Sequence, residues 1–276
     1  MKNIYITDLD HTFLKSDLSL SDYTQKIWNS YAKEAILSVA TARTYKKTMQ
    51  FLEGFVINAP MILLDGALVA TTEKKIIDTK FISKEVGDAI IEVGAGMGIY
   101  PFVLALDTGE KLHELFLYDT ILNRYQKEVL TRYTVDDNLI ECTRIEAKEQ
   151  NFKVVYMGEE QLLRALEAEL KILFKDTLKY ILAPEAYVGC WFLTILHKDA
   201  DKAQGIVSVS EYLGFDVKKL TVFGDNFNDL GMFALAGTSV AVNNAQKEVK
   251  TRADVVLQWS NDEDGIAKYL QRLRNV

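Results

Sequence analysis

Short apolar segments with the length of β-strands alternate with helical patterns at both ends of this 276-residue chain. The strands are predicted, in order, at residues 3–7, 35–40, 61–64, 220–223, 240–242 and 255–257. Helices are predicted between them, over about 21–34, from Arg43 to about Glu53, over about 202–213 and after Asn228. Strands that alternate with helices favour a parallel sheet covered on both faces. We therefore predict an α/β fold built on a doubly wound, Rossmann-like parallel sheet.

The middle of the chain has a different pattern. Helical stretches near residues 84–94 and 161–171 are separated by strand candidates such as 102–105 and 190–193, which indicates an α+β arrangement. Because the two flanking parts complete one sheet, the simplest architecture is a core of residues 1–80 plus 196–276. Residues 81–195 then form an inserted α+β domain.

Composition and charge narrow the functional classes. Hydrophobic residues make up 49% of the chain and charged residues 26%, as expected of a globular protein with a sizeable core. The formal net charge is −7 and no basic run offsets it, so we expect no nucleic-acid binding. The sequence shows neither a signal-peptide pattern nor a membrane-spanning apolar run, and its two cysteines indicate no disulfide framework. We expect a cytoplasmic protein without a membrane partner, and the sequence leaves its oligomeric state open.

A pair of carboxylates follows the first predicted strand. Asp8 and Asp10 are separated by one residue, so in extended geometry both side chains leave the same side of the chain while Leu9 points into the core. One carboxylate can attack phosphorus while the other donates and accepts the protons of the reaction. By itself the pair could equally be two solvated acids at the entrance to a loop.

The other predicted strand ends also carry polar side chains. Thr41 follows the second strand, Asp65 follows the third, and residues 225–229 follow the strand at 220–223. Because ligands bind at the carboxyl ends of the strands in an open parallel sheet, these groups should converge on one crevice. Converging carboxylates repel each other unless a cation neutralises them, and Mg²⁺ is the expected cation for oxygen ligands. The sequence therefore predicts a magnesium site.

Several of these residues could hold a phosphoryl group or the metal. Thr41 offers a hydroxyl and a backbone amide, and Lys202 at the start of a helix could screen negative charge. Asp225 and Asp229 can both face the crevice, while Asn228 is suited to capping the helix or to binding a ligand. In isolation, Thr41 and residues 224–229 could be plain helix caps and Lys202 a solvated surface side chain.

Taken in order, these segments resemble the four motifs of the haloacid dehalogenase-like (HAD) phosphatases. The matching segments are Asp8-Leu9-Asp10-His11-Thr12, Ser38-Val39-Ala40-Thr41-Ala42-Arg43, Lys202, and Gly224-Asp225-Asn226-Phe227-Asn228-Asp229. The long insertion between the second and third motifs resembles the α/β cap of the Cof-like and sucrose-phosphatase-like subfamily IIB. The resemblance covers both ends of the chain well and the middle only by its length and pattern.

The resemblance implies a role for each matching residue. Asp8 would be the nucleophile and a metal ligand, and Asp10 the acid/base, with its backbone carbonyl on the metal. Thr41, Lys202 and Asn228 would bind the phosphate. Asp225 and Asp229 would complete the Mg²⁺ site, with direct ligation by Asn228 or Asp229 left open. The expected reaction is magnesium-dependent hydrolysis of a small phosphomonoester, such as a sugar phosphate, through an aspartyl-phosphate.

Three residues depart from the pattern of the family. His11 stands where glycine is more common, Ala42 replaces the glycine of the usual Thr-Gly-Arg, and Asp65 replaces an asparagine often found before Gly-Ala. None of them removes a required catalytic group. Asp65 in place of this asparagine could alter how the substrate or the flap is held.

Two other functions remain open from the sequence. A phosphomutase or phosphotransferase would use the same aspartyl-phosphate with a sugar as acceptor in place of water, and a non-catalytic phosphosugar-binding protein would keep the fold without turnover. Substrate identity should depend on the inserted domain, since a cap that closes over the site meets the leaving alcohol. Polar candidates for such contacts are Asp107, His113, Glu114 and Tyr187, although each could be ordinary surface.

Overall fold

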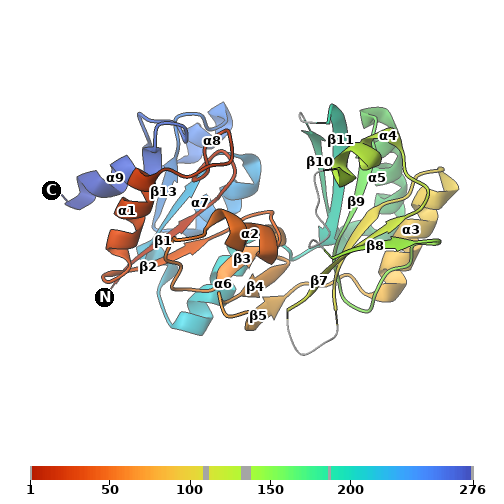
Figure 1. Cartoon of the computed structure of the whole chain (residues 1–276), viewed down its shortest axis with the longest axis horizontal. Helices are drawn as coiled ribbons and strands as arrows, with labels where there is room; N and C mark the ends of the chain where they lie inside the picture. The colour runs from red at the N-terminus through yellow and green to blue at the C-terminus, as the bar shows by residue number, and fades with distance from the viewer. Residues whose placement is uncertain (1, 108–111, 132–137, 186–187, 275–276) are drawn as a thin grey trace. The chain divides into compact units, whose positions relative to one another are not determined.

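The computed structural model describes residues 2–107, 112–131, 138–185 and 188–274 (Figure 1). It divides into two compact units. The core unit combines residues 1–79 with 201–276, and the inserted unit comprises residues 80–200. Tyr187 lies outside the described residues. No helix in the described part of the chain is long and apolar enough to cross a membrane.

A parallel sheet forms the centre of the core unit. Its strand order is β14-β13-β12-β1-β2, and every neighbouring pair is parallel. Side chains such as Ile6, Leu37 and Val222 are fully buried, because helices leave neither face of such a sheet to water. The predicted α/β fold is confirmed. The strands are β1 (Asn3–Thr7), β2 (Ala35–Val39), β12 (Leu220–Gly224), β13 (Thr238–Ala241) and β14 (Val255–Val256).

Among the residues that the structure describes, six helices accompany this sheet in the core unit, with α1 packing against α9 and α6 against α7. The hydroxyl of Tyr31 in α1 donates to the carbonyl of Leu270 in α9. Side-chain caps start several of them: Ser21 accepts from the amide of Thr24, and Asp201 accepts from the amide of Ala203. The helices are α1 (Asp22–Tyr31), α2 (Tyr45–Phe51), α6 (Lys202–Leu213), α7 (Leu230–Leu235), α8 (Lys247–Arg252) and α9 (Gly265–Arg274).

The third strand of the sequence leaves the parallel sheet. β3 (Met61–Leu63) makes one parallel bridge to it, between Ala40 and Ile62, and otherwise pairs antiparallel with β4 (Leu68–Ala70), which pairs antiparallel with β5 (Ile76–Thr79). The turn between β3 and β4 has Gly66 at φ +90°, where a Cβ would lie 2.2 Å from the carbonyl oxygen of Asp201. Only glycine fits at position 66 of this turn, where the backbone packs against the residue before α6.

The inserted unit is an α+β sandwich. Its six-stranded sheet has the order β10-β11-β9-β6-β7-β8, antiparallel except for the pair of β7 with β8. Helices α3 (Lys84–Gly96) and α5 (Glu160–Phe174) cover one face, and α4 (Arg124–Leu130) packs on the other. The strands are β6 (Phe102–Leu106), β7 (Glu114–Asp119), β8 (Leu139–Cys142), β9 (Asn151–Gly158), β10 (Leu178–Glu185) and β11 (Cys190–His197).

Candidate active site

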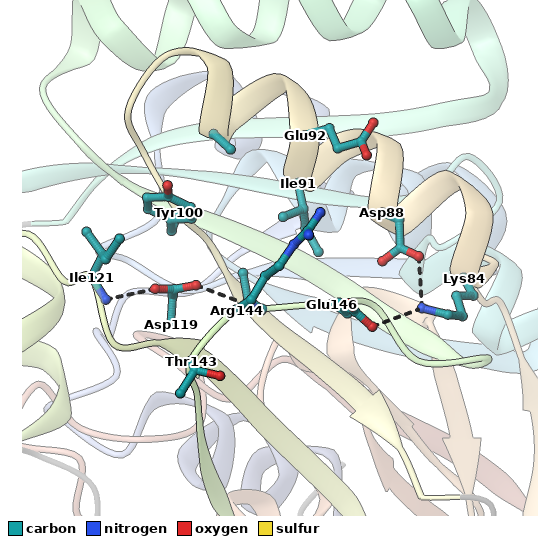
Figure 2. Close-up of a pocket in the computed structure, with 12 residues that line it drawn as sticks. Lys84, Asp88, Ile91, Glu92, Tyr100, Asp119, Ile121, Thr143, Arg144 and Glu146 are labelled. Atoms are coloured by element: carbon teal, nitrogen blue, oxygen red, sulfur yellow. Dashed lines mark hydrogen bonds and ion pairs between the residues drawn. The ribbon is translucent and has the colours of Figure 1, made fainter.

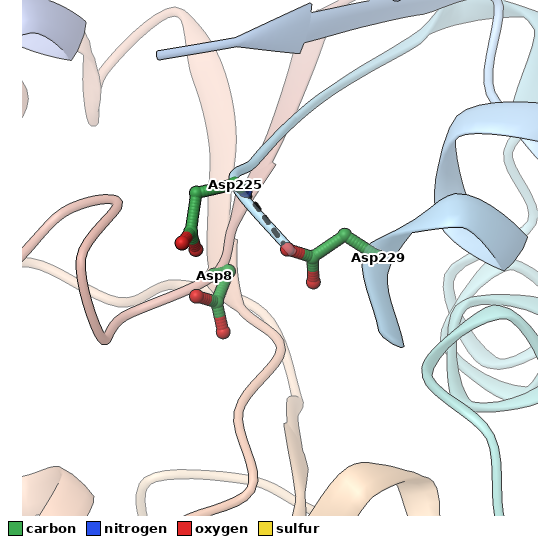
Figure 3. A group of neighbouring side chains, drawn as sticks. All are labelled: Asp8, Asp225 and Asp229. Carbon is green, nitrogen blue, oxygen red and sulfur yellow. Dashed lines mark hydrogen bonds between the residues drawn. The ribbon is translucent and has the colours of Figure 1, made fainter. Parts of the chain in front are cut away.

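Three buried aspartates meet at the carboxyl ends of two neighbouring strands (Figure 3). Asp8 follows β1, Asp225 follows β12, and Asp229 ends the short 3₁₀ turn Phe227–Asp229. Each offers a carboxylate oxygen within 4.8 Å of the others. The parallel pairing of β1 with β12 causes this convergence, because it places Thr7 beside Phe223 and so brings the two strand ends together.

Lys202 lies between two of these carboxylates. It is the first residue of α6 and is 1% exposed. Its Nζ donates to Oδ1 of Asp8 at 2.6 Å and to Oδ1 of Asp229 at 2.8 Å. A lysine is almost never this deeply buried without paired charges, so the alternative of a solvated surface lysine does not hold.

The two oxygens of Asp229 are both engaged. Oδ1 accepts from Lys202, and Oδ2 accepts from the backbone amides of Asp225 at 3.0 Å and Asn226 at 3.1 Å. This carboxylate therefore holds the lysine and the turn after β12 in place. Its oxygens are less available to a cation than those of Asp8 and Asp225.

The remaining oxygens of Asp8 and Asp225 fit a divalent cation. Asp225 uses Oδ1 to accept from the hydroxyl of Thr12 at 2.8 Å, and Asp8 uses Oδ1 for Lys202. Within the described part of the chain, no group donates to Oδ2 of either residue. Hard carboxylate oxygens that lie close together and lack donors are suited to Mg²⁺.

Burial and mutual repulsion make these carboxylates costly to keep charged. Burial raises the pKa of Asp8 well above its ordinary value, Lys202 opposes this shift, and Asp229 and Asp225 add to it. Burial, followed by the charge of Asp229, raises the pKa of Asp225 to about 6. Burial alone would lower the pKa of Lys202, but Asp229 and Asp8 outweigh it and raise the pKa. Lys202 therefore stays charged, but its single positive charge does not offset the negative charges of the three aspartates.

This imbalance predicts that Mg²⁺ stabilises the protein more at about pH 7.5 than at about pH 5. Asp225 has a pKa of about 6 in place of 3.8, so between these values the folded state binds more protons than the unfolded state and the stability of the metal-free protein falls as pH rises. The free energy of unfolding of the metal-free protein falls by an amount on the order of 1–3 kcal/mol. Melting temperatures measured at both pH values with Mg²⁺ and with chelator test it. Equal gains from Mg²⁺ at both pH values would contradict the prediction.

Asp10 is bound by an arginine to which we assigned no role from the sequence. Nε of Arg43 donates to Oδ2 of Asp10 at 2.8 Å, and its NH2 group donates to Oδ1. The guanidinium also lies over the ring of Phe51, 4.4 Å from the ring centre. In the sequence, Arg43 lies two positions after Thr41, a predicted site residue. Its partner Asp10 is 33 residues away, and only the fold brings the two side chains together.

Of the residues expected to bind phosphate, Lys202 contacts two of the three aspartates, whereas Thr41 and Asn228 have hydrogen bonds to other residues. Thr41 is fully buried, but its amide donates to the carbonyl of Ile62 at 2.9 Å and is not available to a ligand. This part of the expectation is corrected: Thr41 can offer only its hydroxyl, which accepts from the amide of Arg43 at 3.2 Å. Nδ2 of Asn228 donates to Oδ1 of Asp65 at 3.1 Å.

Backbone geometry explains one departure from the family pattern. His11 has φ +56°, in the left-handed region that glycine adopts without strain and that histidine adopts more readily than most residues. Its side chain is exposed, and its carbonyl accepts from Nδ2 of Asn244 at 2.7 Å. The preference for glycine at this position is therefore conformational.

A separate pocket of about 560 Å³ lies in the inserted unit (Figure 2). Asp119 at its edge accepts from the amides of Ile121 and Ile145, and Lys84 pairs with Asp88 at 2.9 Å. Asp119 thereby joins its own segment to that of Ile145, whereas the pair of Lys84 with Asp88 lies within α3. Of the candidates for substrate contacts, Asp107 and His113 are exposed and joined by a backbone hydrogen bond of 2.8 Å, and Glu114 begins β7.

Comparisons with known proteins agree with this geometry. The sequence profile of the haloacid dehalogenase-like hydrolases matches residues 5–270. A protein of Haemophilus influenzae is 33% identical over 119 residues, which is 43% of each chain. The 5-amino-6-(5-phospho-D-ribitylamino)uracil phosphatase YwtE of Bacillus subtilis is 23% identical over 99% of this chain and 98% of its own.

Solved structures share the whole fold. TM0651 from Thermotoga maritima superposes with a TM-score of 0.80 at 25% identity, over 99% of this chain and 97% of its own. The subclass IIB sugar phosphatase BT4131 superposes with a TM-score of 0.73 at 18% identity, over all of both chains. At 18% identity, the similarity to BT4131 establishes a shared fold and nothing more.

Proposed function

The chain belongs to the haloacid dehalogenase-like hydrolase family, and from this premise we propose that it is a magnesium-dependent phosphatase of small phosphomonoesters. The observation that supports this most is the buried ammonium of Lys202, 2.6 Å from Asp8 and 2.8 Å from Asp229. A cation in this position offsets the charge of an attacking carboxylate and of the phosphoryl group that it receives.

The proposed reaction has two steps. A carboxylate oxygen of Asp8 attacks phosphorus, the bond from phosphorus to the alcohol oxygen breaks, and Asp10 gives its proton to the departing oxygen. Asp10 then takes a proton from water, whose oxygen attacks the aspartyl-phosphate and releases inorganic phosphate. Asp8 regains its carboxylate and Asp10 its proton. The net change is one ester and one water converted to one alcohol and one phosphate.

Asp8, Asp225 and the backbone carbonyl of Asp10 would hold the Mg²⁺ ion. When bound, Mg²⁺ supplies positive charge that offsets the clustered carboxylates and the substrate phosphate. The hydroxyl of Thr41 and the side chains of Lys202 and Asn228 would bind the phosphoryl oxygens. We assign Asp229 to positioning Lys202, because both of its oxygens already accept hydrogen bonds.

Arg43 adds a requirement to this mechanism. It engages both oxygens of Asp10, so this carboxylate must turn away from the guanidinium before it can reach the departing oxygen. A phosphate group offers Arg43 an alternative anionic partner with the same two-pronged geometry. Substrate binding would thereby free Asp10.

The substrate class is proposed from the relatives. YwtE is named as the phosphatase of a phosphorylated ribitylamino compound and BT4131 as a sugar phosphatase. Both names support a phosphorylated sugar, polyol or similar small metabolite as the substrate here. The inserted unit, residues 80–200, would select the leaving alcohol.

A panel of phosphomonoesters assayed with Mg²⁺ and with chelator tests the proposal. We expect phosphate release from at least one sugar or polyol phosphate, with chelator lowering the rate by roughly 100-fold or more and added Mg²⁺ restoring it. Product analysis separates hydrolysis from transfer, since a phosphomutase would yield an isomeric sugar phosphate. Turnover that ignores chelator would disprove the metal assignment, and no turnover of any ester would disprove the enzyme.

A further inference from the structure

Asp65 lies in a turn of unusual backbone geometry beside the candidate active site. Leu64, Asp65 and Gly66 have φ values of +53°, +55° and +90°, three consecutive residues in the left-handed region. The turn is held on both sides: the amide of Asp65 donates to the carbonyl of Thr41 at 3.0 Å, and Gly66 packs on Asp201. Such strain persists only where the surrounding structure imposes it, and it is concentrated at ligand sites.

Asp65 contacts, or acts by its charge on, each of the three residues that we propose for phosphate binding. The residue is 6% exposed, and its Oδ1 accepts from Nδ2 of Asn228 at 3.1 Å. Its charge acts on Lys202, and its amide is bound to Thr41. It does not belong to the group of carboxylates that could share a metal ion, which is Asp8, Asp225 and Asp229. Its negative charge therefore borders the phosphoryl site without being part of the metal centre.

The second carboxylate oxygen of Asp65 receives no hydrogen bond from any residue that the structure describes. A carboxylate can only accept, and water can reach this oxygen, because it is not one of the fully buried side-chain atoms without a partner. A ligand that displaces this water without donating a hydrogen bond in its place would leave a costly unpaired acceptor. A fully ionised phosphoryl oxygen would make the cost larger, since two acceptors of the same charge would meet. A phosphate that carries a proton would remove the cost by donating its O–H to Asp65.

We propose that Asp65 is a specificity-determining residue that makes the site select oxyanions able to carry a proton, phosphate and phosphomonoester monoanions, over permanently ionised ones such as sulfate. This inference rests on the proposed function, because it takes the site to be a phosphoryl site. A site that is built for one hydrogen bond rejects a ligand that lacks the matching group.

Asp65→Asn tests this inference directly, because it replaces the free carboxylate oxygen and keeps the shape of the side chain and the backbone conformation. Asparagine tolerates the left-handed backbone, and its Oδ1 can still accept from Asn228. Its Nδ2 then occupies the place of the free carboxylate oxygen, so an acceptor becomes a donor of nearly the same shape. Glu248→Gln removes the same charge at an exposed residue in α8 and serves as the matched control.

Calorimetric titration of wild-type, Asp65→Asn and Glu248→Gln proteins with inorganic phosphate and with sulfate, all in Mg²⁺, measures the selectivity. We expect wild type to bind phosphate at least about tenfold more tightly than sulfate, and Asp65→Asn to bring the two within about threefold, chiefly by a gain in sulfate affinity. Glu248→Gln should behave as wild type. Asp65→Gly, which also suits a positive φ, should lose selectivity too and replaces the asparagine variant if that variant does not fold.

An unchanged ratio in the folded Asp65 variants, or equal binding of both anions by wild type, would overturn the inference. The titration needs no turnover. A protein that binds phosphate selectively through Asp65 but hydrolyses no ester would refute the proposed phosphatase and leave this inference standing. A wild-type protein that binds neither anion but releases phosphate from an ester would overturn this inference and leave the proposed phosphatase standing.

Discussion

Asp8→Asn is expected to lower phosphomonoester turnover by roughly 10,000-fold or more. The amide is nearly the same shape as the carboxylate but cannot attack phosphorus to form the covalent intermediate. Single-turnover and steady-state rates of phosphate release measure the loss. Asp17→Asn, which neutralises an exposed acid, is the control and should keep the wild-type rate.

The same variant should keep or gain stability. Burial raises the pKa of Asp8 well above its ordinary value, so at neutral pH the folded state carries a charge that the unfolded chain solvates better. A neutral amide removes this cost, while Lys202 keeps its 2.8 Å contact with Asp229. Urea denaturation of the metal-free protein tests this expectation.

Residual turnover of Asp8→Asn above about 1% of wild type would contradict the assignment of Asp8 as nucleophile.

Lys202→Met is expected to abolish turnover and also to destabilise the fold by about 3–5 kcal/mol. The methionine leaves the buried carboxylates of Asp8 and Asp229 without their shared cation, so two uncompensated charges remain beside the third carboxylate, Asp225. The free energy of unfolding, measured by urea denaturation with chelator present, gives the size of the effect. Lys247→Met, at an exposed position in α8, is the matched control.

The double variant Asp8→Asn/Lys202→Met separates charge balance from packing. We expect it to recover part of the stability lost in Lys202→Met, because only Asp229 then lacks the cation, and the backbone amides of Asp225 and Asn226 still donate to it. Turnover should stay absent. A Lys202→Met protein as stable as wild type would show that the two contacts of this lysine contribute nothing to folding.

The elements around the parallel sheet could be predicted because they follow from local patterns. Strand-length apolar runs that alternate with helical patterns predicted β1, β2, β12 and β13 closely. The run at 61–64 looked the same, but β3 pairs mainly with β4 in a separate antiparallel sheet. Nothing in that run indicates its partner, since pairing depends on the turn at residues 64–66 and on its packing against Asp201.

The acidic residues of the candidate site could also be found from sequence, because Asp8 and Asp225 directly follow predicted strands and Asp10 and Asp229 lie a few positions further along the chain. Asp8 and Asp225 come together once β1 and β12 pair in parallel. Arg43 had no assigned role, although it lies two positions after Thr41. Its importance comes from its contact with Asp10, which depends on how two loops approach each other.

The sequence by itself determined the kind of sheet, the identity of the converging carboxylates and the family resemblance, since all three are carried by residues adjacent in the chain. The tertiary structure alone decided how these groups divide their hydrogen bonds. Lys202 pairs with Asp8, which lies 194 positions away in the chain. The two oxygens of Asp229 accept from Lys202 and from the turn after β12, and the amide of Thr41 donates to the carbonyl of Ile62. Partners this far apart in the chain are chosen by packing, because a hydrogen bond requires two groups within about 3 Å of each other.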